Sequence, residues 1–269
     1  MNSKEIIEKQ TKYIIPTTTE GRWPVVIVEG KGAIVKDLDG KEYIDCHAGY
    51  AAVNVGHCHP PIVKAIQEAV TKIWHVSWDF YTVSTALLAE KIAEIAPFKD
   101  CKSTFHTSGS EANDVAMKMV RRYTGRHEII ALQGNYHGQT YGSRSLGTPV
   151  STYSKEYAVG PYLPGIIHAP APYCYRCALG HTYPECHVQC AQIVEDIINF
   201  STSRDIAAFI AEPILGVGGI ITPPPEYFIE VRKILQEHDA LLIIDEVQTG
   251  LARTGKMWGC QTYNVEPDV

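Results

Sequence analysis

The chain has 269 residues, of which 45% are hydrophobic and 20% charged, and acidic residues outnumber basic ones by 30 to 24. This length and composition can bury a sizeable core, which excludes intrinsic disorder, and the acidic balance argues against a general binder of nucleic-acid phosphates. No apolar run approaches the roughly 20 residues that span a bilayer, and the first residues are polar where a secretion signal is apolar. We therefore expect a soluble, cytoplasmic protein with no nucleic-acid or membrane partner.

The first sixty residues have the pattern of a small mixed segment. Residues 5–12 are expected to form a short helix. Three short runs rich in β-branched residues follow at 25–28, 33–36 and 42–45, and glycine-containing turns separate them. Runs of this kind predict an antiparallel meander of about three strands.

After residue 60 the pattern changes to helices and then to alternating strands and helices. Apolar residues recur at helical spacing in 61–72 and 84–95, which predicts two helices. The strands expected beyond them are 103–107, 128–132, 165–168, 206–211 and 241–245, and the helices are 111–123, 191–200 and 225–238. This alternation predicts an α/β fold of three layers, with helices on both faces of a mainly parallel sheet. Ligands of such sheets bind at the carboxyl ends of the strands.

The first notable strand end, at 105–113, passes through a Ser-Gly-Ser turn directly into a helix. Gly109 allows close approach of the backbone, and Ser110 together with the free N–H groups of a helix start suits a phosphate. The alternative interpretation is an ordinary helix with a serine cap. The spacing matches neither a Walker loop nor a dinucleotide-binding fingerprint, so the motif alone does not decide between the two.

A second strand end, at 134–138, carries Tyr136 and His137 between two glycines. An aromatic ring on a loop at this edge of a sheet can stack on a flat heterocycle. Taken alone, ordinary packing also explains Tyr136, and a satisfied hydrogen bond also explains His137. Whether Tyr136 and His137 have a function therefore depends on the residues at the neighbouring strand ends.

A third strand end places two acidic residues after a fully apolar strand. Asp245 follows the apolar run, and Glu246 and a glycine-containing loop follow Asp245. A buried charge needs a partner, so an acid at this position indicates function rather than packing. It could hold a metal, activate a nucleophile, or keep the nitrogen of a cofactor ring protonated.

Four of the eight cysteines lie close together in the sequence: Cys174, Cys177, Cys186 and Cys190. Their spacing resembles a metal knuckle, and four thiolates can hold zinc or an iron–sulfur cluster. The intervening loop is shorter than in most zinc ribbons, however, and the surrounding prolines are typical of a surface insertion. Reduced structural thiols and a disulfide or redox pair are the alternatives, and the sequence assigns no metal ligands.

Together, these motifs resemble those of the class III pyridoxal-phosphate-dependent aminotransferases, which have the fold called type I. The resemblance runs in order along nearly the whole chain. It rests on NVGHCHP at 54–60, TSGSEAN at 107–113, YHG at 136–138, AEPILGVGG at 211–219 and IDEVQTG at 244–250. Several ordered motifs at such separations make coincidence an unsatisfactory explanation.

The resemblance implies that pyridoxal 5'-phosphate is the cofactor and that four residues surround it. Gly109 and Ser110 would bind its phosphate through backbone and hydroxyl donors. Tyr136 would stack on one face of the pyridine ring, and Val247 would pack against the other face.

Three further residues would act on the chemistry of the cofactor and the substrate. By the same resemblance, Asp245 would pair with the pyridine nitrogen and keep it protonated, so that the ring can withdraw electrons. Gln248 would lie near the phenolic oxygen of the ring. Glu212 would be the acid on the substrate side, where it can pair with a neighbouring arginine. Asp245 and Glu212 are therefore the expected catalytic residues.

The lysine that members of this family bond to the cofactor is expected beyond the sequence given. In the family it ends the strand whose opening reads Pro-Asp-Val, and residues 267–269 match that opening. Lys256 precedes Pro267 and does not take its place. We therefore expect an N-terminal portion that is inactive by itself, with residues 103–107 left without their neighbouring strand.

The resemblance implies transfer of an amino group from an amino acid or ω-amino acid to a 2-oxo acid, in a homodimer. Residues 258–268 are similar to the branch that contains alanine–glyoxylate and 4-aminobutyrate aminotransferases. Residues 1–58 are expected to belong to a small α+β domain and residues 59–269 to the cofactor domain. The alternative function is that of an inactive remnant that acts as an interaction or regulatory subunit.

Overall fold

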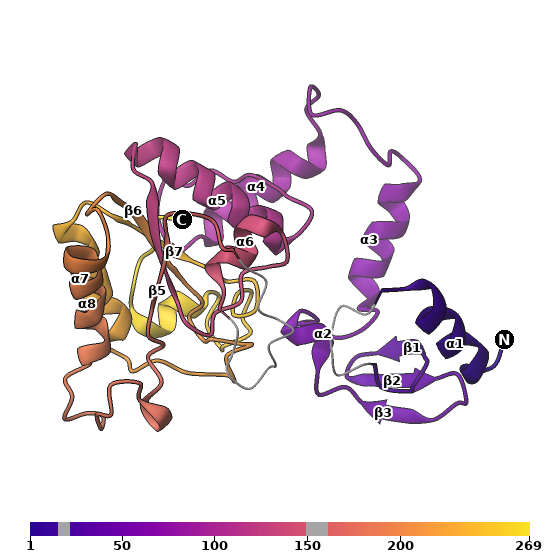
Figure 1. The fold of residues 1–269 in the computed structure, drawn as a ribbon. Coiled ribbons are helices and arrows are strands. Elements are labelled where there is room, and N and C mark those ends of the chain that lie inside the picture. Colours follow the sequence, from indigo (N-terminus) through magenta and orange to yellow (C-terminus); the bar gives the residue numbers. More distant parts are fainter. Residues whose placement is uncertain (16–21, 149–160) are drawn as a thin grey trace. The chain divides into compact units, whose positions relative to one another are not determined.

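The computed structural model describes residues 1–15, 22–148 and 161–269 (Figure 1). The chain divides into two compact units, Met1–Thr82 and Val83–Val269. The domain boundary expected between residues 58 and 59 stays a prediction. Within the described ranges, no helix combines the length and apolar character needed to cross a membrane.

The first unit contains the antiparallel meander that the sequence predicts. Its strands are β1 (Ile27–Lys31), β2 (Ile34–Asp37) and β3 (Glu42–Ile44), paired in that order. Its helical segments are α1 (Ser3–Tyr13), α2 (Ala48–Ala51) and α3 (Pro60–Val70). Helix α1 begins at a capping box, because the side chain of Asn2 accepts from the N–H of Glu5 and the Glu5 carboxylate accepts from the N–H of Asn2.

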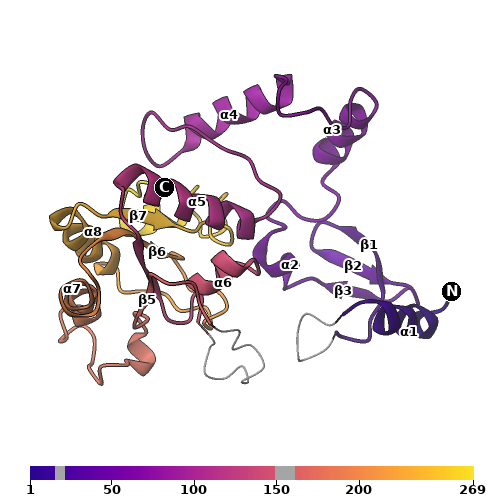
Figure 2. The ribbon, with the colours of Figure 1, turned by 45° about the horizontal axis from the view of Figure 1, so that its top comes forward.

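The second unit is built on a parallel sheet of four strands. These are β4 (Glu128–Leu132), β5 (Ile166–Ala169), β6 (Ile206–Ala211) and β7 (Leu241–Ile244). They lie side by side in the order β5-β4-β6-β7, and every pair of neighbours is parallel. All four carboxyl ends therefore lie at the same edge. Figure 2 labels β5, β6 and β7 of this sheet. Every residue of β6 is buried, as expected of a strand that is covered on both faces.

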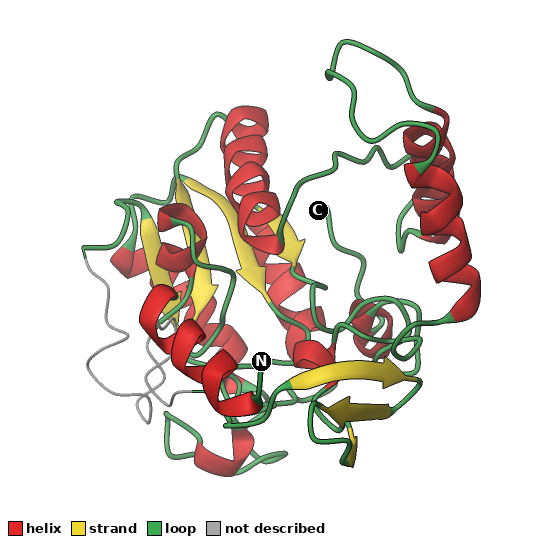
Figure 3. Cartoon of the chain, turned by 90° about the vertical axis from the view of Figure 1, so that its right-hand side faces the viewer, coloured by secondary structure: helices red, strands yellow, loops and turns green. Residues whose placement is uncertain are grey.

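Alternating side chains along β4 decide which helices cover which face of the sheet. The helical segments of this unit are α4 (Val83–Ile95), α5 (Gly109–Thr124), α6 (Tyr141–Leu146), η2 (Cys174–Arg176), α7 (Gln189–Ser201), α8 (Tyr227–Glu237) and η3 (Gly259–Tyr263). Ile130 and Leu132 belong to the core formed with α7 and α8, whereas Ile129 and Ala131 belong to the core formed with α5 and α6. The result is the three-layer arrangement that the sequence predicts (Figure 3).

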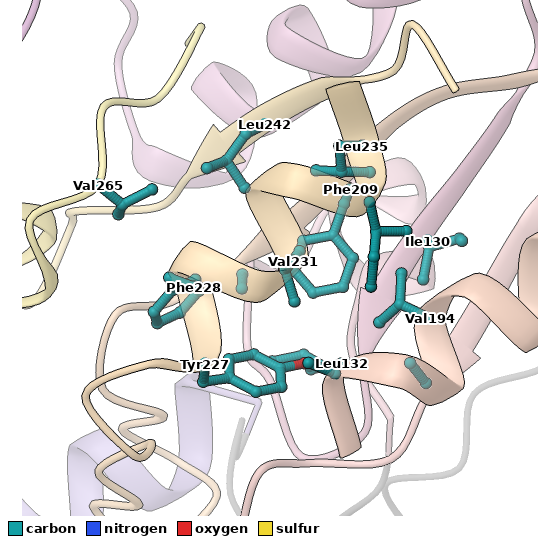
Figure 4. Packing of buried hydrophobic residues seen from close by; sticks show 14 of the residues in the cluster. Ile130, Leu132, Val194, Phe209, Tyr227, Phe228, Val231, Leu235, Leu242 and Val265 are labelled. Carbon is teal, nitrogen blue, oxygen red and sulfur yellow. The ribbon is translucent and has the colours of Figure 1, made fainter. Parts of the chain in front are cut away.

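The larger core lies between the sheet and helices α7 and α8. Phe209 of β6 is fully buried, as are Tyr227 and Phe228 at the start of α8, whose rings are 5.3 Å apart and meet edge to face. Figure 4 shows Val231 and Leu235 of α8 in the same cluster as Phe209. Burial of each side chain of this size contributes about 1.5–3 kcal/mol to the stability of the fold, and this core holds the sheet and its strand ends in place.

The strand predicted at 103–107 is absent. These residues pair with no strand of the described sheets, and 38% of the surface of Phe105 is exposed. A strand exists only where a neighbouring backbone takes up its N–H and C=O groups, and β5 and β7 are the edges of this sheet. Thr104, Phe105 and Thr107 are residue types that favour strands, but residue types cannot supply the backbone that a strand pairs with.

Helix α6 is an element that the sequence did not predict. It has only six residues, which is too short for a helical period to stand out. The sequence does contain an N-cap residue for this helix, Thr140, whose hydroxyl accepts from the N–H of Ser143. At the far end of the chain, the N–H groups of Asp268 and Val269 donate to Leu242, so these residues run beside β7.

Candidate functional site

Four segments come together at the carboxyl edge of the parallel sheet. They are the start of α5 and the loops that follow β4, β6 and β7. Hydrogen bonds join these segments directly: α5 to the loop after β7, the loop after β4 to both, and the loop after β6 to the loop after β4. We define the candidate site as the residues in these segments whose contacts follow.

Asp245 is the centre of this network. One of its carboxylate oxygens, Oδ2, lies 2.8 Å from Nδ2 of Asn113 and 2.8 Å from Nδ1 of His137, and Oδ1 accepts from the N–H of Val247 at 3.0 Å. The carboxylate is 8% exposed. Burial raises the pKa of Asp245, whereas the contacts with His137, Val247 and Asn113 lower it. The lowering is the larger effect, so the pKa of Asp245 is below its usual value. Asp245 is therefore a buried anion at neutral pH.

His137 is held from both sides of its ring. The side-chain amide nitrogen of Asn135 lies 3.0 Å from Nε2 of this ring. On the other side, Nδ1 lies 2.8 Å from Oδ2 of Asp245, so the hydrogen on Nδ1 points to that carboxylate. Asn113 adds a further link, because its amide also donates to the backbone carbonyl of His137 at 2.9 Å. The arrangement fixes the direction of the Asp245 carboxylate.

The start of α5 provides a cradle of small residues. The side chain of Val247 lies against Gly109, where an added Cβ would come within 2.8 Å of a Val247 methyl carbon. Gly138 has φ +141°, and a Cβ there would lie 2.3 Å from Oγ of Ser110. Oγ of Ser110 accepts from the N–H of Gln139 at 3.0 Å, and a hydroxyl that accepts in this way still has its own hydrogen to donate.

Ser110 and Asn113, the α5 residue that donates to Asp245, lie about one helical turn apart. Asn113, which donates to Asp245, is three residues further along α5, and residues three apart share a face of a helix. The first N–H groups of a helix have no partner within it, and they carry partial positive charge. The start of α5 can therefore hold an anion close to the buried carboxylate.

Glu212 lies on the other side of the loop after β4. Its carboxylate accepts from the N–H of Tyr136 at 2.8 Å and from the N–H of Gly216 at 2.9 Å. Burial raises the pKa of Glu212 to about 7, although His137 and the two N–H groups favour the charged form. An added Cβ on Gly216 would come within 1.8 Å of Oε1 of Gln248, which places that amide beside Glu212.

Glu246, the acid next to Asp245, has a different environment. Its carboxylate accepts from the N–H groups of Gly259 and Cys260, both at 2.8 Å, and so caps the start of η3. The contacts of Glu246 are therefore those of a structural cap. Of the two acids at this strand end, Asp245 alone contacts α5 and the loop after β4.

The structure brings all seven sequence-predicted site residues into one connected set. The contacts are Gly109 to Val247, Ser110 to Gly138, Tyr136 to Glu212, Glu212 through Gly216 to Gln248, and Asp245 to Val247. Residues that are neighbours in the chain, at 109–110, 136–138 and 247–248, join these contacts into one set. Sequence patterns did not reveal Asn113 and His137 as partners of Asp245, nor Asn135 as the partner of His137. The available signal was the position of Asn113 one turn after Ser110, and of His137 beside Tyr136.

Comparison with known proteins identifies the family to which this chain belongs. The model of the family described as aminotransferase class-III matches residues 16–269. The chain belongs to the class III aminotransferase family. The chain is 41% identical to acetylornithine aminotransferase of Methanosarcina mazei, covering 98% of this chain and 60% of that enzyme. It is 38% identical to leucine/methionine racemase of Thermococcus litoralis, covering 100% of this chain and 60% of that protein.

Solved structures of transaminases have the same fold as this chain. The structure of an (S)-enantioselective omega-transaminase from Thermomicrobium roseum matches with a TM-score of 0.89 and 34% identity, covering 100% of this chain and 62% of that one. The predicted type I α/β fold is therefore confirmed. The chain spans about 60% of the length of the curated relatives named above. The branch of the family predicted from residues 258–268 stays a prediction.

The raised pKa of Glu212 predicts a pH-dependent stability. Its folded-state pKa of about 7 lies above the ordinary value of 4.5, so folding favours the protonated carboxyl. The stability from this group is fully present below pH 4.5 and is lost as the pH rises to about 7. The variant Glu212→Gln should not show this loss, which is on the order of 3 kcal/mol.

The measurement is urea unfolding of both proteins at a series of pH values between these limits. Glu237→Gln, at an exposed position of α8, is the matched control and should follow the wild type. Parallel curves for the wild type and Glu212→Gln would contradict the prediction.

Proposed function

We propose that the candidate site binds pyridoxal 5'-phosphate and that the whole protein transfers amino groups between amino acids and 2-oxo acids. The observation that carries the proposal is that the buried, negatively charged Asp245 accepts from Asn113, which lies three residues after Ser110 at the start of α5. Pyridoxal phosphate presents a basic ring nitrogen at one end and a phosphate at the other. The residues present fit both ends of this group.

The fit at the ring nitrogen follows from counting lone pairs. A carboxylate has about four lone-pair sites, and Asp245 uses three of them, for Asn113, His137 and the N–H of Val247. One site is left to accept from a protonated ring nitrogen. Asp245 would hold the proton on that nitrogen, and His137 and Asn113 would keep the carboxylate aimed at it.

The remaining site residues would enclose the cofactor. Gly109, Ser110 and the first N–H groups of α5 would bind the phosphate, because these N–H groups have no partner within the helix. Tyr136 and Val247 would lie on opposite faces of the ring, and Gln248 would lie near its phenolic oxygen. When bound, the cofactor supplies an electron-withdrawing ring that stabilises negative charge on the substrate α-carbon.

Glu212 would act on the substrate side of the site. With a pKa of about 7 it can be present as a neutral acid or as an anion near neutral pH. As a neutral acid it would tolerate an apolar or anionic substrate group, and as an anion it would pair with a cation such as an arginine. The amino donor and the 2-oxo acid acceptor are the proposed partners, together with a second copy of the chain in a homodimer.

Racemisation is a second candidate for the same site. The relatives include a leucine/methionine racemase at 38% identity and an isoleucine 2-epimerase at 39%, close to the 41% of acetylornithine aminotransferase. The two reactions differ in their substrates, because amino transfer consumes a 2-oxo acid and racemisation does not. Chiral chromatography of an L-amino acid incubated with and without a 2-oxo acid distinguishes them in the whole protein.

Binding of the cofactor is tested on the chain itself. We expect saturable binding of pyridoxal phosphate, with one molecule per chain, in a titration followed by quenching of tryptophan fluorescence. Pyridoxal, which lacks the phosphate, should bind at least about tenfold more weakly, because it forgoes the charge-assisted contacts at the start of α5. Equal binding of the two compounds, or no saturable binding by a folded chain, would overturn the proposed site.

A further inference from the structure

Four cysteines outside the candidate site surround one small cavity. Cys174, Cys177, Cys186 and Cys190 all line it, from η2, the loop after η2 and the first turn of α7. All four are free thiols in the described residues. The rest of the wall is mainly prolines and aliphatic or aromatic side chains, with His181. The candidate site and its reaction make no use of this cluster.

The size of the cavity limits what it can hold. Its volume is about 10 Å³, which is at the lower limit for a single water molecule. A buried water also needs two to four polar partners, and thiols are weak ones. An organic ligand is excluded by volume. A bare metal ion is smaller than a water molecule, and sulfur is the ligand atom that soft and borderline metals prefer.

We propose that Cys174, Cys177, Cys186 and Cys190 bind one zinc ion in a closed tetrahedral site. The pairs Cys174–Cys177 and Cys186–Cys190 supply two ligands each, as the paired cysteines of structural zinc sites do. Among the described residues, no three side chains of the ligating types are yet grouped as a metal would hold them. Zinc therefore has to draw the four sulfur atoms inward from the walls that they now line.

The backbone between Cys186 and Cys190 supports this assignment. His187 and Val188 have φ values of +48° and +55°, in the left-handed region that a β-branched residue such as Val188 rarely adopts. Such a conformation persists only where its surroundings hold it, and here it turns the chain so that Cys186 and Cys190 face one cavity.

The test is the metal content of the chain, purified without oxygen or chelator after expression with added zinc. We expect one zinc per chain, and X-ray absorption should show sulfur neighbours at about 2.3 Å. Cys177→Ser and Cys186→Ser should each bind zinc at least about tenfold more weakly, since loss of even a supporting partner commonly costs that much. Cys46→Ser, at an exposed cysteine of the other unit, is the matched control and should keep the metal.

A second measurement needs no variant. Removal of zinc by a chelator should make four further thiols react with a thiol reagent, and zinc should protect them again. A folded chain with no zinc would overturn the proposal. So would iron and sulfide in place of zinc, or disulfides among these cysteines in the metal-free protein. None of these readouts depends on pyridoxal phosphate, so the zinc site and the proposed function stand or fall separately.

Discussion

Asp245→Asn is expected to bind pyridoxal phosphate at least about tenfold more weakly than the wild type and to lose about 3–5 kcal/mol of stability. The amide carries no charge to pair with a protonated ring nitrogen. It also leaves the donors of Asn113 and His137, both 2.8 Å from Oδ2, without the anion that they now serve. Turnover by the whole protein should fall about a hundredfold or more.

The measurements are urea unfolding at pH 7 and titration with pyridoxal phosphate. Glu246→Gln is the matched control, since it changes the neighbouring acid, which caps η3 and does not contact α5. It should lose about 1–3 kcal/mol of stability and keep its affinity for the cofactor. Wild-type affinity in Asp245→Asn would show that the buried carboxylate does not face the ring nitrogen.

Gly138→Ala is expected to destabilise the chain by about 2–4 kcal/mol and to weaken cofactor binding. Gly138 has φ +141°, where only glycine is unstrained, and the new Cβ would meet Oγ of Ser110 at 2.3 Å and its Cα at 2.7 Å. Because the second of these atoms belongs to the backbone, rotation of a side chain cannot relieve the contact. The start of α5 has to move, and the proposed phosphate contacts move with it.

Gly219→Ala separates the two causes of this effect. Gly219 also has a positive φ, +115°, but an added Cβ there meets no atom within 4 Å. It should therefore lose only the strain, about 1–3 kcal/mol, and keep its affinity for pyridoxal phosphate. Urea unfolding and the fluorescence titration compare the two variants directly. Equal losses of stability, with cofactor affinity unchanged in both, would contradict the steric argument.

Much of the fold could be predicted because local patterns are strong in this chain. Strands β4 and β6 were predicted at the bounds that they have, since their apolar runs of four and six residues are buried on both faces. Local patterns do not predict pairing between strands, as residues 103–107 show. Their pattern is that of a strand, but the edge that would have to pair with them is a property of the assembled sheet.

The same distinction applies to the candidate site. Asp245 could be identified because an acid after four apolar residues has few structural explanations. Its partners could not, because Asn113 is 132 residues away in the chain and His137 is 108 residues away. No periodicity connects such positions. The separate environments of Asp245 and Glu246 were equally hidden, since the sequence shows only two adjacent acids.

The sequence by itself determined the α/β class, the position of the strand ends and the residue types placed there. Local patterns of burial and turn formation fix these features, and they act over a few residues. The tertiary structure alone decided which strand ends meet. The order β5-β4-β6-β7 puts β4 beside β6, and β6 beside β7, although other elements separate them in the chain. That order brings Glu212, His137 and Asp245 together, because neighbouring parallel strands end at one edge whatever their distance in sequence.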